Sequence, residues 1–315
     1  MIYKSIIIMK MKKPFLKWVG GKHKLLTHII SKIPKQINSY HDIFLGGGSV
    51  LLALLTLEKN NKISINGTIN AYDLNERLIN TFKQVKNNHE LLILLTKNLI
   101  QQYENIKINS HKQKGAPKVN IENYNQTREH FYYWICHKFN TTEYNTTLNA
   151  AYFIFLNKIG FRGMFRENKD GDYNIPFGLK DRKTLNFPNV ILEDEIITIS
   201  ELIQKVQFYH LDFENSIKKV KKGDFVYLDP PYVPEDKKSF VGYNACGFDL
   251  DTHNKLFALV RKFNSQKVKF IMSNSNTDLV NNTFVDYNKE IITARRAINS
   301  KNPADKTKEV VIFNS

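Results

Sequence analysis

Three consecutive glycines at positions 46–48 separate an apolar strand-like run from an apolar helix-like run. Residues 39–45 predict a short buried strand that ends at these glycines, and Ser49 is placed to cap a helix over residues 50–57. A strand, a glycine turn and a helix in this order are typical of an α/β sheet. The chain is therefore expected to fold around such a sheet.

The same alternation of strands and helices continues along the chain. Residues 68–73 predict a second strand, and residues 74–85 have helical spacing. The elements expected late in the chain are a strand at 224–228, a helix at 250–263, a strand at 269–273 and a closing hairpin formed by 290–294 and 309–313. We predict one α/β domain whose two parts are far apart in the sequence.

The middle of the chain differs in composition from both flanks. A polar, lysine-rich segment at 106–125 precedes two aromatic helical stretches at 128–139 and 148–158, and a loop-rich basic segment at 161–188 follows. We interpret this region as an insertion into the α/β domain. The predicted boundaries are 12–84 and 196–315 for the α/β domain, 85–195 for the mainly helical insertion, and 1–11 for a flexible N-terminal extension.

The charge balance points to a polyanionic partner. Lys and Arg number 46 against 30 Asp and Glu, a net charge of +16, which favours nucleic acid first and an acidic membrane surface second. The two cysteines, Cys136 and Cys246, form neither a disulfide framework nor a metal-binding spacing, so we expect an intracellular, cytoplasmic setting and no metal. No apolar run approaches the roughly 18 residues that a membrane span requires, and no membrane partner is expected.

The glycine turn suits a ligand that the backbone must approach closely, because only glycine leaves the room. The dinucleotide pattern GxGxxG fails at Leu51, which weakens the case for a nicotinamide enzyme. Asp73 ends the second predicted strand, where such folds place a carboxylate that accepts hydrogen bonds from ribose hydroxyls. A nucleoside without a pyrophosphate fits better, and the alternative is a tight turn with a helix-capping aspartate.

The segment 15–22 ends in two glycines and a lysine but is not a phosphate-binding loop. The pattern GxxxxGK[ST] needs a glycine at Leu16 and a hydroxyl at His23, and both are absent. The remaining aromatic, glycine and lysine residues could stack on a purine and pair with a carboxylate. The alternative is a basic surface turn.

The tetrapeptide 229–232, Asp-Pro-Pro-Tyr, follows a predicted buried strand. The prolines fix the exit of the chain and leave the carbonyl of Pro230 outside regular structure. Asp229 adds a second acceptor and Tyr232 a flat face for stacking. This set suits a planar heterocycle that bears an amino group, whereas the alternative is a turn-capping aspartate with a core tyrosine.

An amino group conjugated to a purine is a poor nucleophile because its lone pair is delocalised into the ring. Hydrogen bonds from its two N–H groups to Asp229 and the Pro230 carbonyl favour a pyramidal, more reactive nitrogen that can attack a sulfonium methyl. The carboxylate then stabilises the positive charge that develops on the nitrogen. The chain lacks a Pro-Cys pair, which argues against methylation of a cytosine ring carbon.

Three segments together resemble the Dam-type DNA adenine methyltransferases, which use S-adenosyl-L-methionine. They are 15–22, similar to the N-terminal cofactor segment of the family, 44–49, similar to its glycine-rich motif, and 229–232, similar to its catalytic motif, and they occur in the family's order. The resemblance implies a Rossmann-like methyltransferase fold with an inserted DNA target-recognition domain. It also implies base flipping, in which the target adenine leaves the duplex before methylation.

The resemblance assigns roles to individual residues. In catalysis, Asp229 and Pro230 would hold the adenine amine and Tyr232 would stack on the base. The implied cofactor contacts are Trp18, Lys22, Phe44, Gly46, Gly48, Asp73 and Asp229.

The segments 156–166 and 173–178 resemble the target-recognition part of the family. Arg166 occupies the position where the family places an arginine on a guanine edge, whereas Arg162 replaces the asparagine of the best-known GATC members. The implied DNA contacts are Arg162, Met164, Arg166, Pro176, Arg295 and Arg296, the last two on phosphates.

The expected function is site-specific methylation of adenine in double-stranded DNA, within GATC or a related short site. We expect a monomer. A cognate restriction endonuclease is a further possible partner, and the two enzymes would then form a restriction-modification system. The alternatives are an amino methyltransferase that acts on cytosine or RNA, and a catalytically inactive DNA-binding relative. A nicotinamide dehydrogenase is more remote.

Overall fold

The structure of the protein is a computed structural model that describes residues 12–22, 25–106, 115–178, 193–234, 248–295 and 306–314. The chain divides into two compact units. Unit 1 includes Lys22–Leu74 and Lys205–Ser315, and unit 2 consists of Lys13–Gly21 and Asn75–Gln204.

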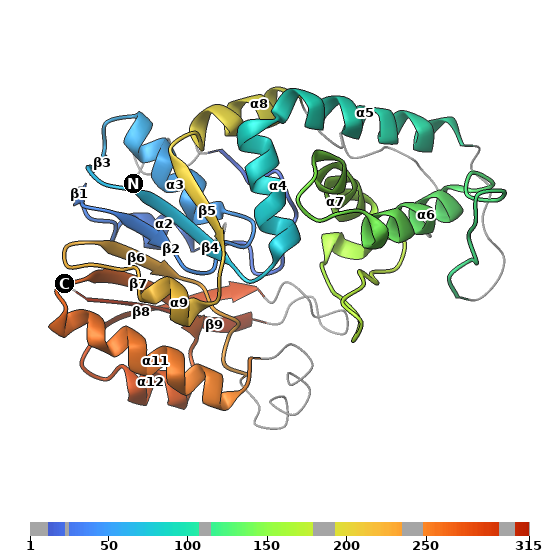
Figure 1. Cartoon of the computed structure of the whole chain (residues 1–315). Helices are drawn as coiled ribbons and strands as arrows, with labels where there is room; N and C mark the ends of the chain where they lie inside the picture. Colours follow the sequence, from blue (N-terminus) through green and yellow to red (C-terminus); the bar gives the residue numbers. More distant parts are fainter. Residues whose placement is uncertain are drawn as a thin grey trace. The chain divides into compact units, whose positions relative to one another are not determined.

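Unit 1 is built on a seven-stranded sheet with the strand order β5-β4-β2-β6-β7-β9-β8 (Figure 1). The pairings from β5 to β7 are parallel, and β9 runs antiparallel to both β7 and β8. The strands are β2 (Tyr40–Asp42), β4 (Ile69–Asp73), β5 (Val206–His210), β6 (Phe225–Leu228), β7 (Lys269–Ser275), β8 (Asn288–Arg295) and β9 (Lys306–Phe313). The short strands β1 (Gln36–Ile37) and β3 (Ser64–Ile65) form a separate parallel pair.

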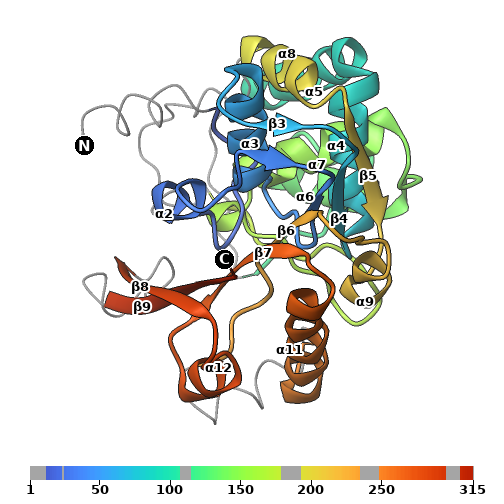
Figure 2. The same cartoon turned by 90° about the vertical axis from the view of Figure 1, so that its left-hand side faces the viewer.

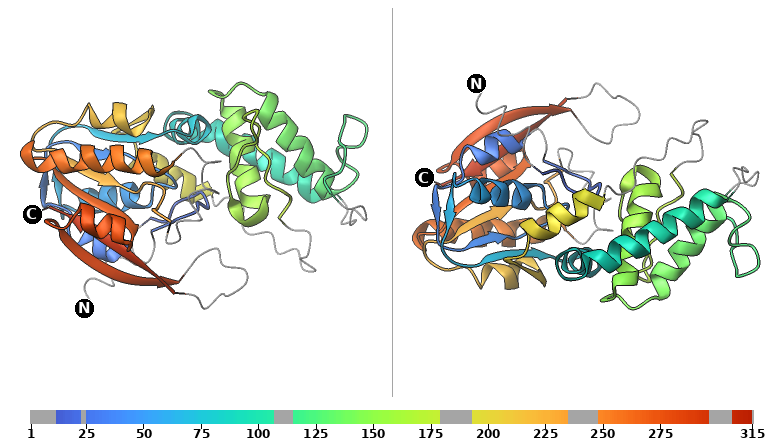
Figure 3. Two further views of the ribbon diagram at one scale, coloured as in Figure 1. Left: turned by 90° about the horizontal axis from the view of Figure 1, so that it is seen from below. Right: turned by 90° about the horizontal axis from the view of Figure 1, so that it is seen from above.

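Helices cover both faces of the central, parallel part of the sheet, because the crossovers between parallel strands place them there. Every residue of β2 and β6 is buried, as expected for strands between two layers of helices. Helix α3 (Ser49–Lys59) lies on one side of the sheet, and α11 (Leu250–Ser265) and α12 (Asp278–Thr283) lie on the other (Figures 2 and 3). The expected α/β, Rossmann-like architecture is confirmed.

The main apolar core of unit 1 lies under α11 and α12. The residues that α11 contributes are Leu256, Phe257, Val260 and Phe263, and these pack with Phe270 and Met272 of β7. The remaining helices of this unit are α2 (Leu26–Ile30) and α9 (Phe213–Ile217). Burial of this many large side chains holds the parallel strands in one register.

Unit 2 is mainly helical. The helices are α4 (Glu76–Asn87), α5 (His89–Asn105), α6 (Arg128–Thr141), α7 (Thr147–Ile159), the 3-10 turn η1 (Phe161–Gly163) and α8 (Glu193–Leu202). Helix α7 is buried along most of its length and packs against α4, α5 and α6. Phe131 and Tyr132, in the first of the two aromatic helical stretches, are buried.

The N-terminal segment Lys13–Gly21 folds with unit 2. The side chain of Asn157 on α7 accepts a hydrogen bond from the Lys17 amide (2.8 Å) and donates one to the Lys17 carbonyl (2.7 Å). The ring of Phe15 packs edge-on against Phe82 of α4, with centroids 5.3 Å apart. Residues 13–21, 75–84 and 196–204, which the sequence assigned to the α/β domain, group with the helical unit.

The amino-terminal end of the sheet is tied together by one buried carboxylate. Asp224, immediately before β6, accepts four hydrogen bonds, from Asn38 Nδ2 (2.9 Å), the Ser39 amide (3.2 Å), the Lys221 amide (2.8 Å) and His41 Nε2 (3.1 Å). These bonds fix the start of β2 against β6 and orient the buried imidazole.

We expect Asp224→Ala to destabilise the protein by about 3 kcal/mol, because the buried His41 imidazole and three partly buried donors lose their acceptor. Chemical denaturation measures this loss. The matched control is Asp251→Ala on the exposed side of α11, which should stay close to the wild type. Equal stability of the two variants would contradict this role of Asp224.

Candidate functional site

Three aspartates meet at the carboxyl end of neighbouring parallel strands in unit 1. Asp42 ends β2, Asp73 ends β4, and Asp229 directly follows β6. The sheet order is β4-β2-β6, and the order of strands along the chain reverses at β2. In open α/β sheets, ligands bind outside the carboxyl ends of the strands at such a reversal.

Asp229 is paired with Lys22. Its Oδ2 lies 2.7 Å from Lys22 Nζ, and the two side chains are 21% and 5% exposed. Burial raises the pKa of the Asp229 carboxyl, and the neighbouring ammonium of Lys22 acts in the opposite direction. Within the described part of the chain, no hydrogen-bond donor reaches Asp229 Oδ1, which is buried. One oxygen is thus available to a ligand while the other holds Lys22.

Tyr232 lies beside this ion pair. Lys22 Nζ is 4.9 Å from the centroid of the Tyr232 ring, and the Tyr232 hydroxyl donates a hydrogen bond to Glu309 Oε2 at 2.9 Å. Pro230 is buried. The backbone after the tetrapeptide is fixed because the Val233 amide donates to Asn274 Oδ1 on β7 at 3.0 Å.

The glycine turn is bound to the neighbouring aspartate. Gly46 and Gly48 adopt the left-handed φ values of 50° and 75°, which favour glycine. The Gly46 amide donates to Asp73 Oδ2 at 2.9 Å. Ser49, expected as the helix cap, is instead the first residue of α3, and Gly48 is the N-cap without a side-chain bond. The cap moves back because the left-handed Gly48 already starts the helix.

Phe44 contributes an apolar surface next to the glycine turn. It is partly buried, and its ring lies 6.1 Å from the rings of both Phe213 and Phe248. Together with the tetrapeptide and the glycine turn, unit 1 therefore contains six of the seven predicted cofactor residues: Lys22, Phe44, Gly46, Gly48, Asp73 and Asp229.

Asp42 is a site residue that the sequence did not single out. Its Oδ2 accepts a hydrogen bond from the Tyr40 hydroxyl at 3.2 Å, and Oδ1 is buried with no donor among the residues that the structure describes. Burial, together with the charges of Asp229 and Asp73, raises the pKa of the Asp42 carboxyl to about 8. A carboxylate at the end of a buried strand is the signal that could have identified it.

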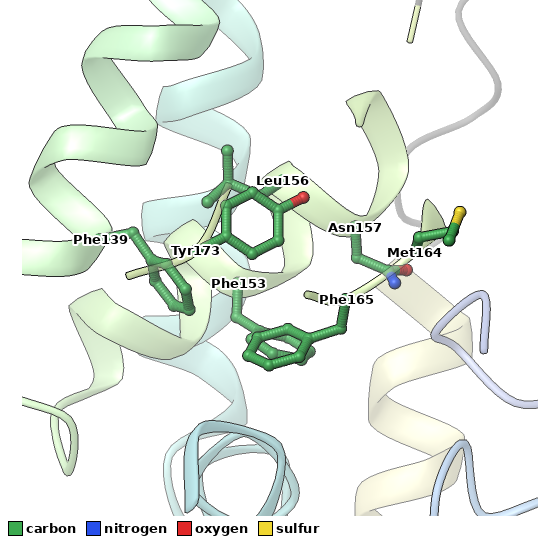
Figure 4. Close-up of a pocket in the computed structure, with 7 residues that line it drawn as sticks. All are labelled: Phe139, Phe153, Leu156, Asn157, Met164, Phe165 and Tyr173. Carbon is green, nitrogen blue, oxygen red and sulfur yellow. The ribbon is translucent and has the colours of Figure 1, made fainter. Parts of the chain in front are cut away.

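Trp18, the seventh predicted cofactor residue, belongs to unit 2. Its ring stacks on Phe153 and Phe165, with centroids 6.3 and 6.2 Å apart. Figure 4 shows the rings of Phe153 and Phe165 close together in the pocket that they line with Phe139, Leu156, Asn157, Met164 and Tyr173. This pocket has no room for a water molecule, so its aromatic side chains pack against one another rather than around a ligand.

The predicted recognition residues of unit 2 lie around the loop after α7. Arg166 is exposed, and its Nε and Nη2 donate to the Oδ1 (2.7 Å) and the carbonyl (3.2 Å) of Asn174. Arg162 is exposed with φ of 57°, and its guanidinium lies 5.2 Å from the Phe161 ring centroid. Pro176 is exposed, and its carbonyl accepts from the Phe161 amide at 2.9 Å.

The side chains of the two predicted phosphate contacts, Arg295 and Arg296, lie outside the part of the chain that the structure describes. Arg295 is the last residue of β8, and the placement of its side chain is outside the described part. Arg296 lies outside the described residues, as does Cys246. Cys136 is buried on α6.

Within the described ranges, no group of three or more His, Cys, Asp or Glu side chains is arranged to hold a metal ion. Among the helices of the described residues, none combines the length and apolar character that a membrane crossing requires.

The high pKa of Asp42 predicts a pH-dependent stability. The folded protein binds a proton between the ordinary value of 3.8 and about 8, so the stability that this group contributes is lost as pH rises through that range. Asp42→Asn keeps an acceptor for Tyr40 but cannot ionise. The free energy of unfolding of the variant should therefore rise, relative to that of the wild type, by more than about 1 kcal/mol between pH 4 and pH 8. One pH unit of pKa difference corresponds to about 1.4 kcal/mol. Parallel pH profiles of unfolding free energy would rule this out.

The chain matches one family model and several characterised relatives. The model of the D12 class N6 adenine-specific DNA methyltransferases matches residues 18–298. The chain is 32% identical over 306 residues to a protein of Methanocaldococcus jannaschii named Type II methyltransferase M.MjaIII, which covers 94% of this chain and 96% of the relative.

Two further relatives carry related names. A protein of Lactococcus lactis named Type II methyltransferase M1.LlaDCHI is 30% identical, over 96% of this chain and 95% of the relative. A DNA adenine methylase of Salmonella typhi is 28% identical, over 93% of this chain and 91% of the relative. These matches confirm the resemblance carried by the three motifs. The chain belongs to the D12 class of N6 adenine-specific DNA methyltransferases, enzymes that methylate adenine in DNA.

Proposed function

We propose that this enzyme uses S-adenosyl-L-methionine as the methyl donor and binds it at the carboxyl edge of the unit 1 sheet. When bound, S-adenosylmethionine supplies a methyl group on a positively charged sulfonium. The residues of the edge suit such a group, because Asp42 and Asp229 each have a buried oxygen without a donor in the described part of the chain. Buried carboxylates close to one another favour a cationic ligand.

Six of the seven predicted cofactor residues have a supporting feature in unit 1. Gly46 and Gly48 let the backbone approach the ligand, and Asp73, held by the Gly46 amide, is oriented to accept from ribose hydroxyls. Phe44 offers an apolar ring, and the ammonium of Lys22 opposes the effect of burial, which raises the pKa of Asp229. Trp18 remains in the proposal on the resemblance of its segment alone.

The observation that carries the proposed catalysis is the divided role of Asp229. Its Oδ2 is held by Lys22, and its Oδ1 can accept an N–H from the adenine amine. The Pro230 carbonyl would accept the second N–H and Tyr232 would stack on the base. The carboxylate, paired with Lys22, then stabilises the positive charge that develops on the nitrogen.

The substrate is proposed to be a flipped-out adenine in duplex DNA, because a stacked and paired base cannot present its amine to a recessed carboxylate. The recognition site is proposed to be GATC or a related short sequence, and the relatives named Type II methyltransferases raise a restriction endonuclease as a partner. We retain a monomer as the proposed state.

The exposed loop after α7 is proposed to contact the DNA, as part of a target-recognition region that includes 85–195. Asn174 occupies the Nε side of the Arg166 guanidinium, which leaves the end of the fork for a bidentate pair with guanine. The other proposed contacts are Arg162, Met164 and Pro176 in this loop, and Arg295 and Arg296 on phosphates.

Asp229→Ala should reduce methyl transfer to DNA by about 100-fold or more, because the developing charge loses its stabilising carboxylate. Duplex affinity should stay within about threefold, since phosphate contacts dominate binding. Incorporation of tritiated methyl groups and fluorescence anisotropy measure the two effects, with Asp251→Ala as the control. Substantial turnover by the variant would exclude this catalytic role.

Arg166→Ala should relax selectivity at one guanine, with a loss of about 1 to 3 kcal/mol of discrimination. Sequencing of DNA from a methylation-free host that expresses each protein gives the modified adenines and their flanking bases. Lys169→Ala removes an exposed charge of the same loop and should leave the target sequence unchanged. If Arg166→Ala also left it unchanged, the guanine assignment would be wrong.

A further inference from the structure

Glu309 reaches the edge of the active site from the antiparallel side of the sheet. It lies on β9 opposite Ser275, the last residue of β7 (Figure 2). Its Oε2 accepts a hydrogen bond from the Tyr232 hydroxyl at 2.9 Å, across 77 positions of sequence. The closing hairpin therefore supplies a side chain to the catalytic tetrapeptide in addition to covering the sheet.

The Tyr232 ring is fixed at both ends. At the backbone end, the amide of Val233 donates to Asn274 Oδ1 at 3.0 Å, and the Val233 carbonyl accepts from the Ser275 hydroxyl. At the other end, the ring hydroxyl is bound to Glu309. A tyrosine side chain has two rotatable bonds before the ring, and the two anchors fix the axis of the ring. Because a phenolic O–H lies in the plane of its ring, donation toward Glu309 also favours one rotation of the ring about that axis.

The Tyr232 hydroxyl is a dependable donor. Burial raises its pKa far above the ordinary value, and the negative charges of Asp229 and Glu309 add to this effect. The phenol therefore stays protonated near neutral pH and donates to the carboxylate of Glu309. A hydrogen bond to a charged acceptor is stronger than one between neutral groups.

We propose that Glu309 is a positioning residue that holds the Tyr232 ring in the plane on which the target adenine stacks. This inference rests on the proposed stacking role of Tyr232. Glu309 touches the hydroxyl of the tyrosine and acts on the reaction only through the orientation of the ring.

Glu309 also carries a charge close to Asp229. Its effect on the pKa of Asp229 can be separated from its hydrogen bond with Tyr232 by two substitutions. Burial raises the pKa of Asp229, Lys22 lowers it and Glu309 raises it further. Glu309→Gln removes the charge but keeps an oxygen that can accept from Tyr232. Glu309→Ala removes both.

The test is a double-mutant cycle on methyl transfer to duplex DNA. Glu309→Ala and Tyr232→Phe should each lower kcat/KM by about tenfold, because each removes the same hydrogen bond. The double variant should lose no more than either single variant, and Glu309→Gln should stay within about threefold of the wild type. The affinity for S-adenosylmethionine, measured by calorimetry, should be unchanged in all of them.

Thermal unfolding is measured for every variant, with Glu290→Ala as the matched control. Glu290 lies on the adjacent strand β8, where it pairs with Lys32 at 2.9 Å, and its loss should leave kcat/KM unchanged. Three results would each overturn the positioning role. They are wild-type kcat/KM for Glu309→Ala, a kcat/KM of the double variant about 100-fold below the wild type, and a loss for Glu309→Gln as large as that for Glu309→Ala. A wild-type protein that does not methylate adenine with this donor would overturn the proposed function instead.

Discussion

The concentration of carboxylates at one end of the parallel sheet is the constraint on which the site depends. Asp42, Asp73 and Asp229 end adjacent strands, and parallel pairing brings strand ends of the same kind to one edge. Buried like charges repel one another and lose their hydration, so each needs compensation. Lys22 compensates Asp229, the Gly46 amide binds Asp73, and Asp42 is held largely protonated near neutral pH.

The carboxylates are not fully compensated by protein groups, which leaves acceptors for a ligand. Asp229 and Asp42 retain buried oxygens without donors in the described ranges, and such groups cost free energy until a ligand satisfies them. A cationic donor and an amine substrate would each supply what is missing. Rigid surroundings keep the acceptors in place, because β7 fixes the backbone after the tetrapeptide through Asn274.

In unit 2, hydrogen bonds of asparagine side chains also hold neighbouring segments in place. Its centre is the buried helix α7, from which Asn157 holds the backbone of Lys17. In the loop that follows α7, Asn174 restrains Arg166. An arginine with one side of its fork already occupied loses less conformational freedom when it binds a base edge.

The sequence by itself determined the local elements and the chemistry of the motifs. Apolar runs and glycine positions located β2, β4, β6, β7 and the β8–β9 hairpin, because strand and turn preferences act over a few neighbouring residues. The tetrapeptide 229–232 likewise indicated two hydrogen-bond acceptors, the Asp229 carboxylate and the Pro230 carbonyl, and the aromatic ring of Tyr232. Helix α5 was not located individually, since its region was assigned only to a mainly helical insertion.

Only the tertiary structure decided which distant residues meet. The pairing of Tyr232 with Glu309 follows from the register of β9 on β7, and the folding of Lys13–Gly21 with the helical unit follows from two bonds to Asn157. The burial that raises the pKa of Asp42 depends on the layers that cover the sheet. Such contacts join residues that no local preference connects, because they form only when the packing of the whole unit offsets the entropy of closing long loops.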